Sequence, residues 1–432
     1  MNATQRGGIG CVIVILFLVA CVAITFGVLP ALNTAVAIPV IMVPGEPYDP
    51  SLPVDSFRWT NTLTAMVLGS LAVLAFAFFA WRSSNGWKRE VPSRFQSWVE
   101  MLGGFIYDFS KGMAGARARW VFPLVATIFV FLLAINWMKL LPGVESVGVM
   151  HCAEEGFSGY PAVRAGGAFQ LYVDQPLYAG QGATEADYEA CNEFFHHGDV
   201  HAPEQTELVA AADLLFDEEA ALRTELTEAG ADAATIDAEV QALRLEVTES
   251  VYHHPSFALT ADQLREGAYP YIFIVTPFLR GGSTDLNLTI GLALISVISI
   301  QVFGVLAQGP NYFQKFINLR ALGNAGKNPI GAIDVVVGLI EIISELGKII
   351  SLAFRLFGNM FAGGILLIVM SFLVAAIVPM VFYGLELIIT TIQALVFAVL
   401  TLVFAAQAME GHHGDEEHHD EHSDQPVERT HI

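Results

Sequence analysis

The chain has 432 residues, of which 54% are hydrophobic, and a formal net charge of −22. The acidic excess lies in two segments: residues 151–270 carry 23 acidic and 4 basic side chains, and residues 410–432 carry 8 and 1, so the remainder has 12 acidic and 16 basic side chains. This composition excludes an ordinary soluble domain, and we expect no nucleic-acid partner.

Six apolar runs are long enough to cross a bilayer, and they fall at residues 9–29, 60–81, 120–141, 286–307, 333–378 and 381–408. We therefore predict an all-α polytopic membrane protein with about six hydrophobic segments. The chain divides into a first hydrophobic segment with an outer connection, transmembrane and interfacial helices, an acidic insertion, core helices and an acidic, His-rich tail. The corresponding ranges are 1–57, 58–150, 151–270, 271–409 and 410–432.

The positions of the basic residues predict the orientation of the chain in the membrane. They fill the connections after the second and fourth runs, which by the positive-inside rule are cytoplasmic; the main ones are Arg82, Lys88, Arg89, Arg94, Lys111, Arg117, Arg119, Lys315, Arg320 and Lys327. Alternating crossings then place both termini inside and the acidic insertion outside. The first run, with Arg6 before it and Ala35-Val36-Ala37 after it, also resembles a secretory signal, but its length favours a retained helix.

An amphipathic segment lies between the second and third runs. Its apolar residues recur at helical spacing on one side, at Phe95, Trp98, Val99, Leu102 and Ile106. This pattern is typical of an interfacial helix, which we expect on the cytoplasmic surface.

The acidic insertion has the pattern of a helical hairpin. Leu208, Leu215 and Leu222 recur every seven residues, and a second periodic segment follows the break at Gly230. Its carboxylates are typical of a solvated face. Cys152 and Cys191 both lie in this insertion and could pair in an oxidising compartment, although sequence alone gives no distance between them.

The carboxyl-terminal tail contains six of the twelve histidines of the chain. Metal binding by these histidines is conceivable. The low-complexity acidic context and the absence of HExxH spacing favour a solvated tail instead.

The fifth run predicts a helix of about 46 residues, ended by Pro379, and therefore roughly 70 Å long. Because this is more than twice the hydrocarbon thickness, we expect this helix and the next one to be strongly tilted. Polar residues form a stripe along it at three-, four- and seven-residue steps, namely Glu341, Ser344, Glu345, Lys348, Ser351, Arg355 and Asn359. The next helix offers Glu386 and Gln393, again seven residues apart.

Arg355 is the least expected residue of this stripe. A charge at bilayer depth costs at least about 2.5 to 3.5 kcal/mol, and arginine does not deprotonate in proteins. Glu345 and Lys348 could form an internal ion pair, but no acid lies within one turn of Arg355. The sequence therefore predicts that its partner comes from elsewhere, across a side lined by small residues such as Gly358 and Gly363.

The segment SLAFRLFGNMFAGG, which contains Arg355, resembles the signature of the a subunit of F-type ATP synthases. Further segments resemble the family in the family order, including FRWTNTLTAMVLG, PLVATIFVFLLAINWMKLLPG, STDLNLTIGLAL and TTIQALVFAVLTLVFAAQAMEGHH. The resemblance implies a non-catalytic, proton-translocating subunit of the membrane sector, without a cofactor. Its implied partners are the c-subunit ring, the b subunits of the peripheral stalk, the rest of the ATP synthase and the lipid bilayer. We expect a multi-pass protein of an energy-transducing membrane, the bacterial plasma membrane.

The resemblance also implies roles for individual residues. Arg355 would meet the ionised carboxylate of each c subunit as the ring turns, between two aqueous half-channels. The other positions that match the family pattern are Glu341, Ser351, Asn359, Gln393, Asn136, Ser283, Asp285 and Asn287. Three positions depart from it. Gly364 stands where some members have an acid or a histidine, and Lys139 stands where some have an acid. Glu386 stands where some have a histidine. We infer that Glu386 carries the outer-channel carboxylate.

Two other functions fit the sequence less well. A self-sufficient ion transporter, with Arg355 paired internally, would predict internal repeats, which the sequence lacks. A membrane-embedded hydrolase would need a nucleophile and a base, but the apolar runs contain no histidine. The chain also lacks a GxxxxGK[ST] loop, so nucleotide chemistry would lie in other subunits.

Overall fold

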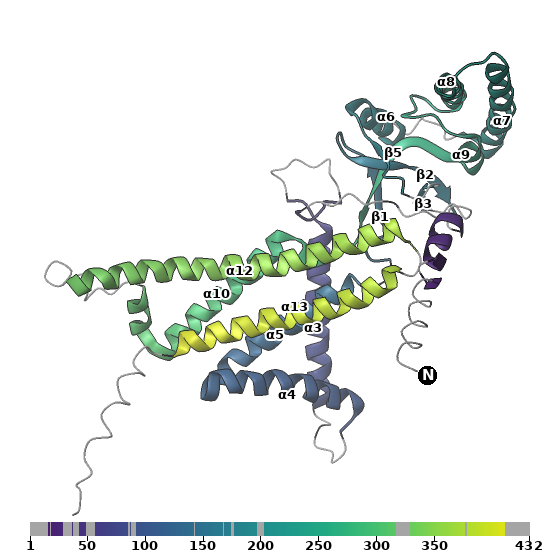
Figure 1. The fold of residues 1–432 in the computed structure, drawn as a ribbon. Helices are drawn as coiled ribbons and strands as arrows, with labels where there is room; N and C mark the ends of the chain where they lie inside the picture. The colour runs from purple at the N-terminus through teal and green to yellow at the C-terminus, as the bar shows by residue number, and fades with distance from the viewer. Residues whose placement is uncertain are drawn as a thin grey trace, which may run out of the picture. The chain divides into compact units, whose positions relative to one another are not determined.

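The computed structural model describes residues 16–17, 19–28, 37, 43–48, 57–84, 87, 92–141, 143–166, 168–173, 177–196, 203–316, 329–375 and 378–410 (Figure 1). The His-rich tail, residues 9–15 of the first apolar run, and Lys88, Arg89, Arg320 and Lys327 lie outside these residues. The chain forms two compact units. One comprises Met1–Ala65, Lys139–Gly281 and Phe361–Ile388, and the other comprises Met66–Met138, Gly282–Met360 and Ile389–Ile432.

Within the described part of the chain, five helical segments are long and apolar enough to cross a membrane. They are built from α3 (Asn61–Ser84), α4 (Arg94–Ala114) continued by η2 (Gly115–Arg117) and α5 (Ala118–Met138), α10 (Leu286–Gln308) continued by η4 (Gly309–Lys315), α12 (Pro329–Leu373) and α13 (Val378–Met409). The predicted class of a helical, polytopic membrane protein is confirmed. In the first apolar run, the structure describes a short π-helix, η1 (Ile24–Val28).

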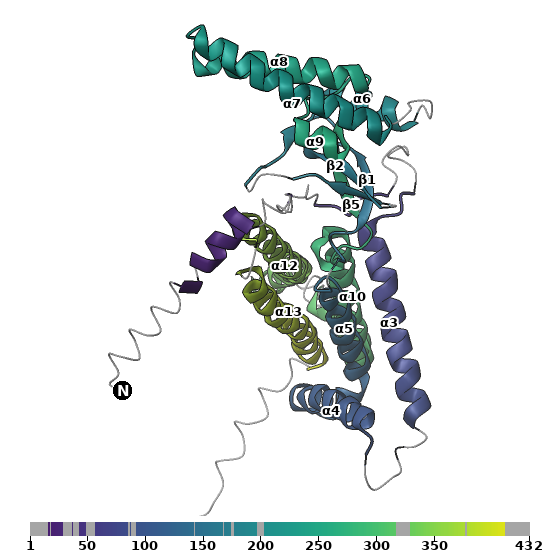
Figure 2. The same cartoon turned by 90° about the vertical axis from the view of Figure 1, so that its right-hand side faces the viewer.

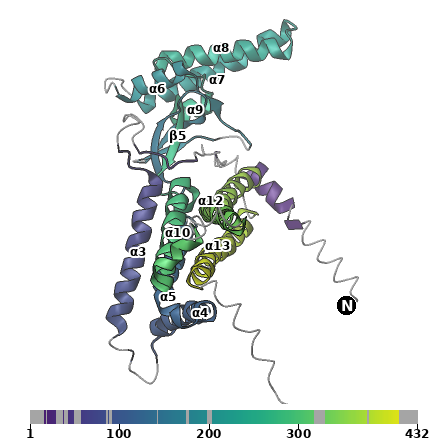
Figure 3. The same cartoon turned by 90° about the vertical axis from the view of Figure 1, so that its left-hand side faces the viewer.

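The second unit has one hydrophobic core, to which α5, α10, α12 and α13 all contribute. Val125 and Leu132 of α5 are seven residues apart, and they pack in this core with Ile300, Leu356 and Leu402 from the other three helices. Figures 2 and 3 show α5 beside α10, and α12 running along α13. Burial on facing helical stripes therefore positions the polar residues of these helices.

The α12 helix has 45 residues, close to the predicted length, and at 1.5 Å per residue it spans roughly 68 Å. The predicted boundary at Pro379 is wrong. The helix ends at Leu373, and Pro379 is the second residue of α13. Proline is favoured in the first turn of a helix because its missing N–H would have no intrahelical partner there.

The predicted amphipathic helix is α4. The Ser93 side chain caps its amino terminus by accepting a hydrogen bond from the Gln96 backbone N–H. The helix packs on α5, with Ile106 in the common core, while Phe95 and Trp98 remain exposed. Part of the predicted apolar side is therefore available to a membrane interface.

The acidic insertion contains a β-sheet that the sequence analysis did not predict. Its five strands are β1 (Gly148–Cys152), β2 (Ser158–Ala165), β3 (Ala168–Leu171), β4 (Gln181–Gly182) and β5 (Ala268–Pro277). The order is β1-β5-β2-β3, with β4 on β2, and all pairs are antiparallel. The central strand β5 starts from residues assigned to the insertion and continues past them, so the folded domain is larger than the range 151–270.

The predicted helical hairpin is present as α7 (Gln205–Glu228) and α8 (Ala233–Val251), with Gly230 at a φ of 75° in the connection. Two further helices, α6 (Glu185–His196) and α9 (Ala261–Glu266), pack on β5 (Figure 2). Leu208 and Leu215 of α7 are buried in the same core as Cys152 and Cys191, which form a disulfide with Cα atoms 5.7 Å apart. The hairpin is thus part of a domain with its own hydrophobic core.

Candidate functional site

Arg355 lies in the middle of α12 with its side chain exposed on the surface of the chain. The adjacent Leu352, Ala353 and Leu356 are buried in the helical core, which fixes the direction in which Arg355 points. No described residue forms a hydrogen bond or an ion pair with its guanidinium. Within this chain, Arg355 is therefore on an outer surface, and its partner is not one of the described residues.

The exposed surface of α12 beside the polar stripe that contains Arg355 is apolar. On the preceding turns, large exposed side chains include Ile343, Leu346, Ile350 and Phe354, which lie on other sides of the helix than Arg355. Such a surface, with an unpaired charge beside it, would be costly in lipid. It is suited to contact with a protein surface that supplies a negative charge.

Two polar residues border Arg355 at steps of one helical turn, since Ser351 and Asn359 are both exposed on the same side of α12. The Asn359 side-chain amide donates a 2.6 Å hydrogen bond to Gln393 Oε1 on α13. Gln393 is buried, and its Nε2 has no hydrogen-bond partner among the described residues. The structure therefore brings Asn359 and Gln393 together, one turn from Arg355.

The acidic residues of the same stripe are paired within the chain. Glu345 Oε1 lies 2.8 Å from Lys348 Nζ and 3.2 Å from Lys315 Nζ. Glu341 lies 2.5 Å from the same Lys315 ammonium, and Gln301 donates a 2.9 Å hydrogen bond to Glu345 Oε2. This arrangement agrees with the internal ion pair considered for Glu345 and Lys348, and it links α10, η4 and α12.

The residues near the start of α10 form a separate polar group. The Ser283 hydroxyl donates a 2.5 Å hydrogen bond to Asn136 Oδ1 on α5, and both residues are buried. Asp285 caps α10, because its side chain accepts a 2.9 Å hydrogen bond from the Asn287 backbone N–H. The Asn287 side chain is exposed. Asp285 therefore has a structural role as the cap of α10, in addition to the role in proton translocation that the resemblance implies.

Glu386 of α13 is buried and forms an ion pair with Lys139, which directly follows α5. Gly363 of α12 lies against the Glu386 carboxylate, whereas a Cβ at Gly364 would have open space around it. The sequence analysis did not predict this pair, because its members are 247 positions apart. The signal was nevertheless present: Lys139 and Glu386 are two uncompensated charges of opposite sign at the ends of apolar runs.

The described residues contain no group of three or more His, Cys, Asp or Glu side chains that could hold a metal ion. The histidines of the tail lie outside the described residues.

The long apolar helices and the polar residues held between them define a multi-pass membrane protein with a polar, ion-pair-rich helical core. The family described as ATP synthase A chain matches residues 63–162 and 265–406, which together are more than half of the chain. The chain belongs to this family. It is therefore an a subunit, the proton-translocating subunit of the ATP synthase membrane sector, in an energy-transducing membrane. The family match omits residues 163–264, which include β3, β4 and α6 to α8.

Proposed function

We propose that this a subunit forms two aqueous half-channels against a rotating ring of c subunits, with Arg355 as the fixed charge between them. Each ring carboxylate would lose its proton to one half-channel before it meets Arg355, and would take up a proton from the other after passing it. A guanidinium favours the ionised carboxylate and cannot release a proton itself, so it would also prevent a direct leak between the half-channels.

The observation that carries this proposal is that Arg355 is exposed and without a described partner on α12, next to a largely apolar exposed surface of the same helix. An internally paired arginine, as a self-sufficient transporter would need, finds no support in this geometry. Glu341, Ser351, Asn359, Gln393, Asn136, Asp285, Asn287 and Glu386 would contribute the polar surfaces of the half-channels.

The proposal is tested by Arg355→Ala in membranes that carry the complete ATP synthase. We expect proton-driven ATP synthesis to be lost, because the ring carboxylate no longer meets a fixed charge, while the soluble head still hydrolyses ATP. Normal synthesis in the variant would contradict the proposal.

Lys348→Met is the matched control, since it removes a cation from the same helix seven residues earlier. Glu345 then keeps its second partner, Lys315, 3.2 Å away. We expect coupled synthesis to fall much less in this variant than in Arg355→Ala. An equal loss in both would mean that any cation removed from α12 disrupts assembly.

We further propose that the domain formed by β1 to β5 and α6 to α9 faces the outside, in a bacterial plasma membrane. The positive-inside pattern supports this orientation. The Cys152–Cys191 disulfide supports it independently, because disulfides persist in oxidising compartments. The b subunits of the peripheral stalk would then contact the cytoplasmic side.

A further inference from the structure

The ion pair between Lys139 and Glu386 is among the most deeply buried charge pairs of the described chain, with both side chains 3% exposed. Removing two charges from water costs free energy that their mutual attraction often does not recover, and apolar residues of similar size frequently serve stability as well or better. Stability alone therefore does not account for a lysine and a glutamate at these two positions.

Two glycines provide the space that the pair occupies. A Cβ added at Gly363 would lie 2.8 Å from Glu386 Cδ and against both carboxylate oxygens. A Cβ added at Gly281 would lie 2.9 Å from Lys139 Cδ and 3.3 Å from its Cβ. The Gly281 backbone N–H also donates a 3.3 Å hydrogen bond to Glu145, which places a second acid on the lysine side. The backbone on both sides is thus shaped around this pair.

We propose that Lys139 is a positioning residue of the proton path: its ammonium keeps the Glu386 carboxylate ionised and held over Gly363, ready to accept a proton. The inference rests on the proposed function and adds the counter-ion of the outer carboxylate. A proton that arrives from the aqueous side neutralises Glu386 and weakens its attraction to Lys139. When Glu386 passes the same proton toward the ring, the ion pair forms again, so one proton enters for each one that leaves.

The first test compares proton flux through the membrane sector in membranes carrying the full complex. We expect Lys139→Met to slow the flux about as much as Glu386→Gln does, and Lys139→Arg to restore most of it, because arginine also supplies a positive charge. Parent-like flux in Lys139→Met would overturn the inference.

The double variant Lys139→Met with Glu386→Gln separates this role from a structural lock. It leaves no buried charge without a partner, so a pair that only fastens α13 would regain parent-like flux when both charges are removed. If Glu386 must be ionised to work, the double variant stays as slow as Glu386→Gln alone. Recovery of flux in the double variant would therefore overturn the inference.

Infrared difference spectroscopy of the purified complex gives a readout that a structural lock would not change. Loss of the ammonium should leave Glu386 protonated, so a carboxyl C=O band should appear in Lys139→Met relative to the parent. The band should be absent from the double variant, which lacks the carboxyl group. If no band appears in Lys139→Met, Lys139 does not maintain the charge of Glu386.

A glycine pair on α12 provides the last control. Gly363→Ala should slow proton flux because the added methyl group displaces the Glu386 carboxylate, whereas Gly364→Ala, with nothing within 4 Å of its Cβ, should not. Equal flux in the two variants would count against the inference. Arg355→Ala in the same membranes separates this inference from the proposed function. If Arg355→Ala abolishes coupling while Lys139→Met keeps parent-like flux, only this inference fails. If Arg355→Ala leaves coupling intact, the proposed function fails.

Discussion

Arg355 and Gln393 differ in how they are held, although both lie close to the proposed meeting point with the ring. Arg355 is exposed, whereas Gln393 is buried and fixed by the 2.6 Å hydrogen bond from Asn359. The bond joins α12 to α13 one turn from Arg355. It therefore limits how far the two helices can separate beside the proposed site.

This bond gives a prediction for Gln393→Ala. Loss of one buried hydrogen bond typically changes a free energy by about 0.5 to 1.5 kcal/mol, so we expect coupled ATP synthesis to fall about two- to tenfold. Synthesis rates in energised membranes provide the measurement. Gln407→Ala, an exposed glutamine on the same helix, is the control and should leave the rate unchanged. If Asn359→Ala and Gln393→Ala act additively in the double variant, the hydrogen bond does not couple them.

At single positions, the sequence predicted where polar and charged side chains lie along a helix better than it predicted which residues they pair with. The stripe of Glu341, Lys348 and Arg355 followed from helical periodicity, which depends only on local spacing. The Lys139–Glu386 and Lys315–Glu345 pairs did not follow from it, because they join segments whose contact is decided by tertiary packing. The exposure of Arg355 could not be predicted either, because a local sequence pattern does not show which face of a long apolar helix stays uncovered by the rest of the chain.

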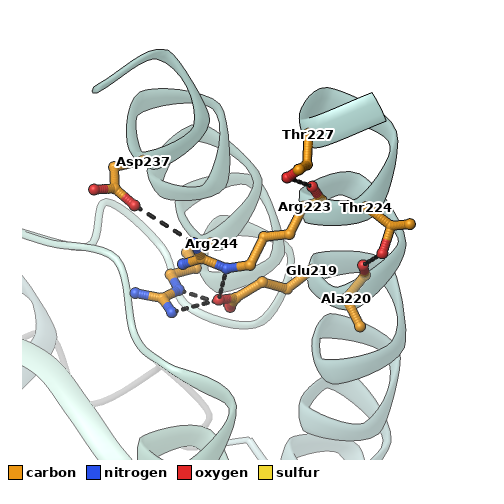
Figure 4. A network of polar contacts seen from close by, with 7 residues as sticks. All are labelled: Glu219, Ala220, Arg223, Thr224, Thr227, Asp237 and Arg244. Carbon is orange, nitrogen blue, oxygen red and sulfur yellow. Dashed lines mark hydrogen bonds and ion pairs between the residues drawn. The ribbon is translucent and has the colours of Figure 1, made fainter. Parts of the chain in front are cut away.

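At the scale of elements, the α7 and α8 hairpin is joined by a charged network (Figure 4). Glu219 accepts hydrogen bonds of 2.7 and 2.9 Å from Arg244 and one of 3.1 Å from Arg223. Burial raises the pKa of the Glu219 carboxyl, but the hydrogen bonds from Arg244 and Arg223 outweigh burial and hold the pKa below its ordinary value of 4.5. The ionised form of Glu219 therefore stabilises the hairpin.

The sign of the pH dependence follows from that lowered pKa. The stabilisation is fully present above about pH 4.5 and is lost as the pH falls through the lower pKa of the folded state. We expect hydrogen-exchange protection of α7 and α8 in the intact complex to be constant near neutral pH and to decrease in acid. Glu219→Gln should lower the protection already at pH 7, by about 1 to 3 kcal/mol, and remove most of the acid-dependent change.

The adjacent Glu218→Gln is the control, because Glu218 is exposed and has no described partner. It should leave both the protection and its pH dependence as they are in the parent. Equal effects of the two substitutions would show that the general acidity of the hairpin, rather than the bonds to Arg244 and Arg223, sets its stability.

Helices were predictable from the sequence where a hydropathy or periodicity pattern extends over many residues. Hydropathy located the apolar helices from α3 onward, and the break at Gly230 located the hairpin. The sheet was missed because three of its strands have five residues or fewer and the central strand lacks alternation. In β5, six consecutive residues from Ala268 are buried, so no polar face marks the strand. The run Tyr271–Thr276, rich in aromatic and β-branched residues, was the available signal.

At the scale of the whole molecule, the orientation of the inserted domain is the main open prediction. If the domain faces outside, Cys152 and Cys191 should be inaccessible to thiol reagents until they are reduced. In intact cells, a membrane-impermeant maleimide should label a cysteine introduced at the exposed position Glu218, and labelling should not require disruption of the membrane. Labelling only after the cells are broken would place the domain inside and reverse the predicted orientation.

A Cys152→Ser and Cys191→Ser variant is the control for this measurement, since any remaining label then comes from other cysteines. The variant also tests the domain itself. Tyr271, whose pKa is raised by burial to about 12, and Phe194, whose ring stacks on it at 4.7 Å, report on the same core. A core held by apolar packing should keep these rings buried without the disulfide, which tyrosine fluorescence quenching can check.

The pairing of β1 with β5 has a consequence for how such a chain can change over generations. Gly148 lies opposite Pro277, so the first and last strands of the inserted domain begin and end at one place, about 4.8 Å apart. More than a hundred residues are thus added between α5 and α10 without moving apart the two points at which the chain leaves and returns. A domain attached through two adjacent connections can be gained, lost or exchanged in evolution while the spacing of the transmembrane helices is preserved.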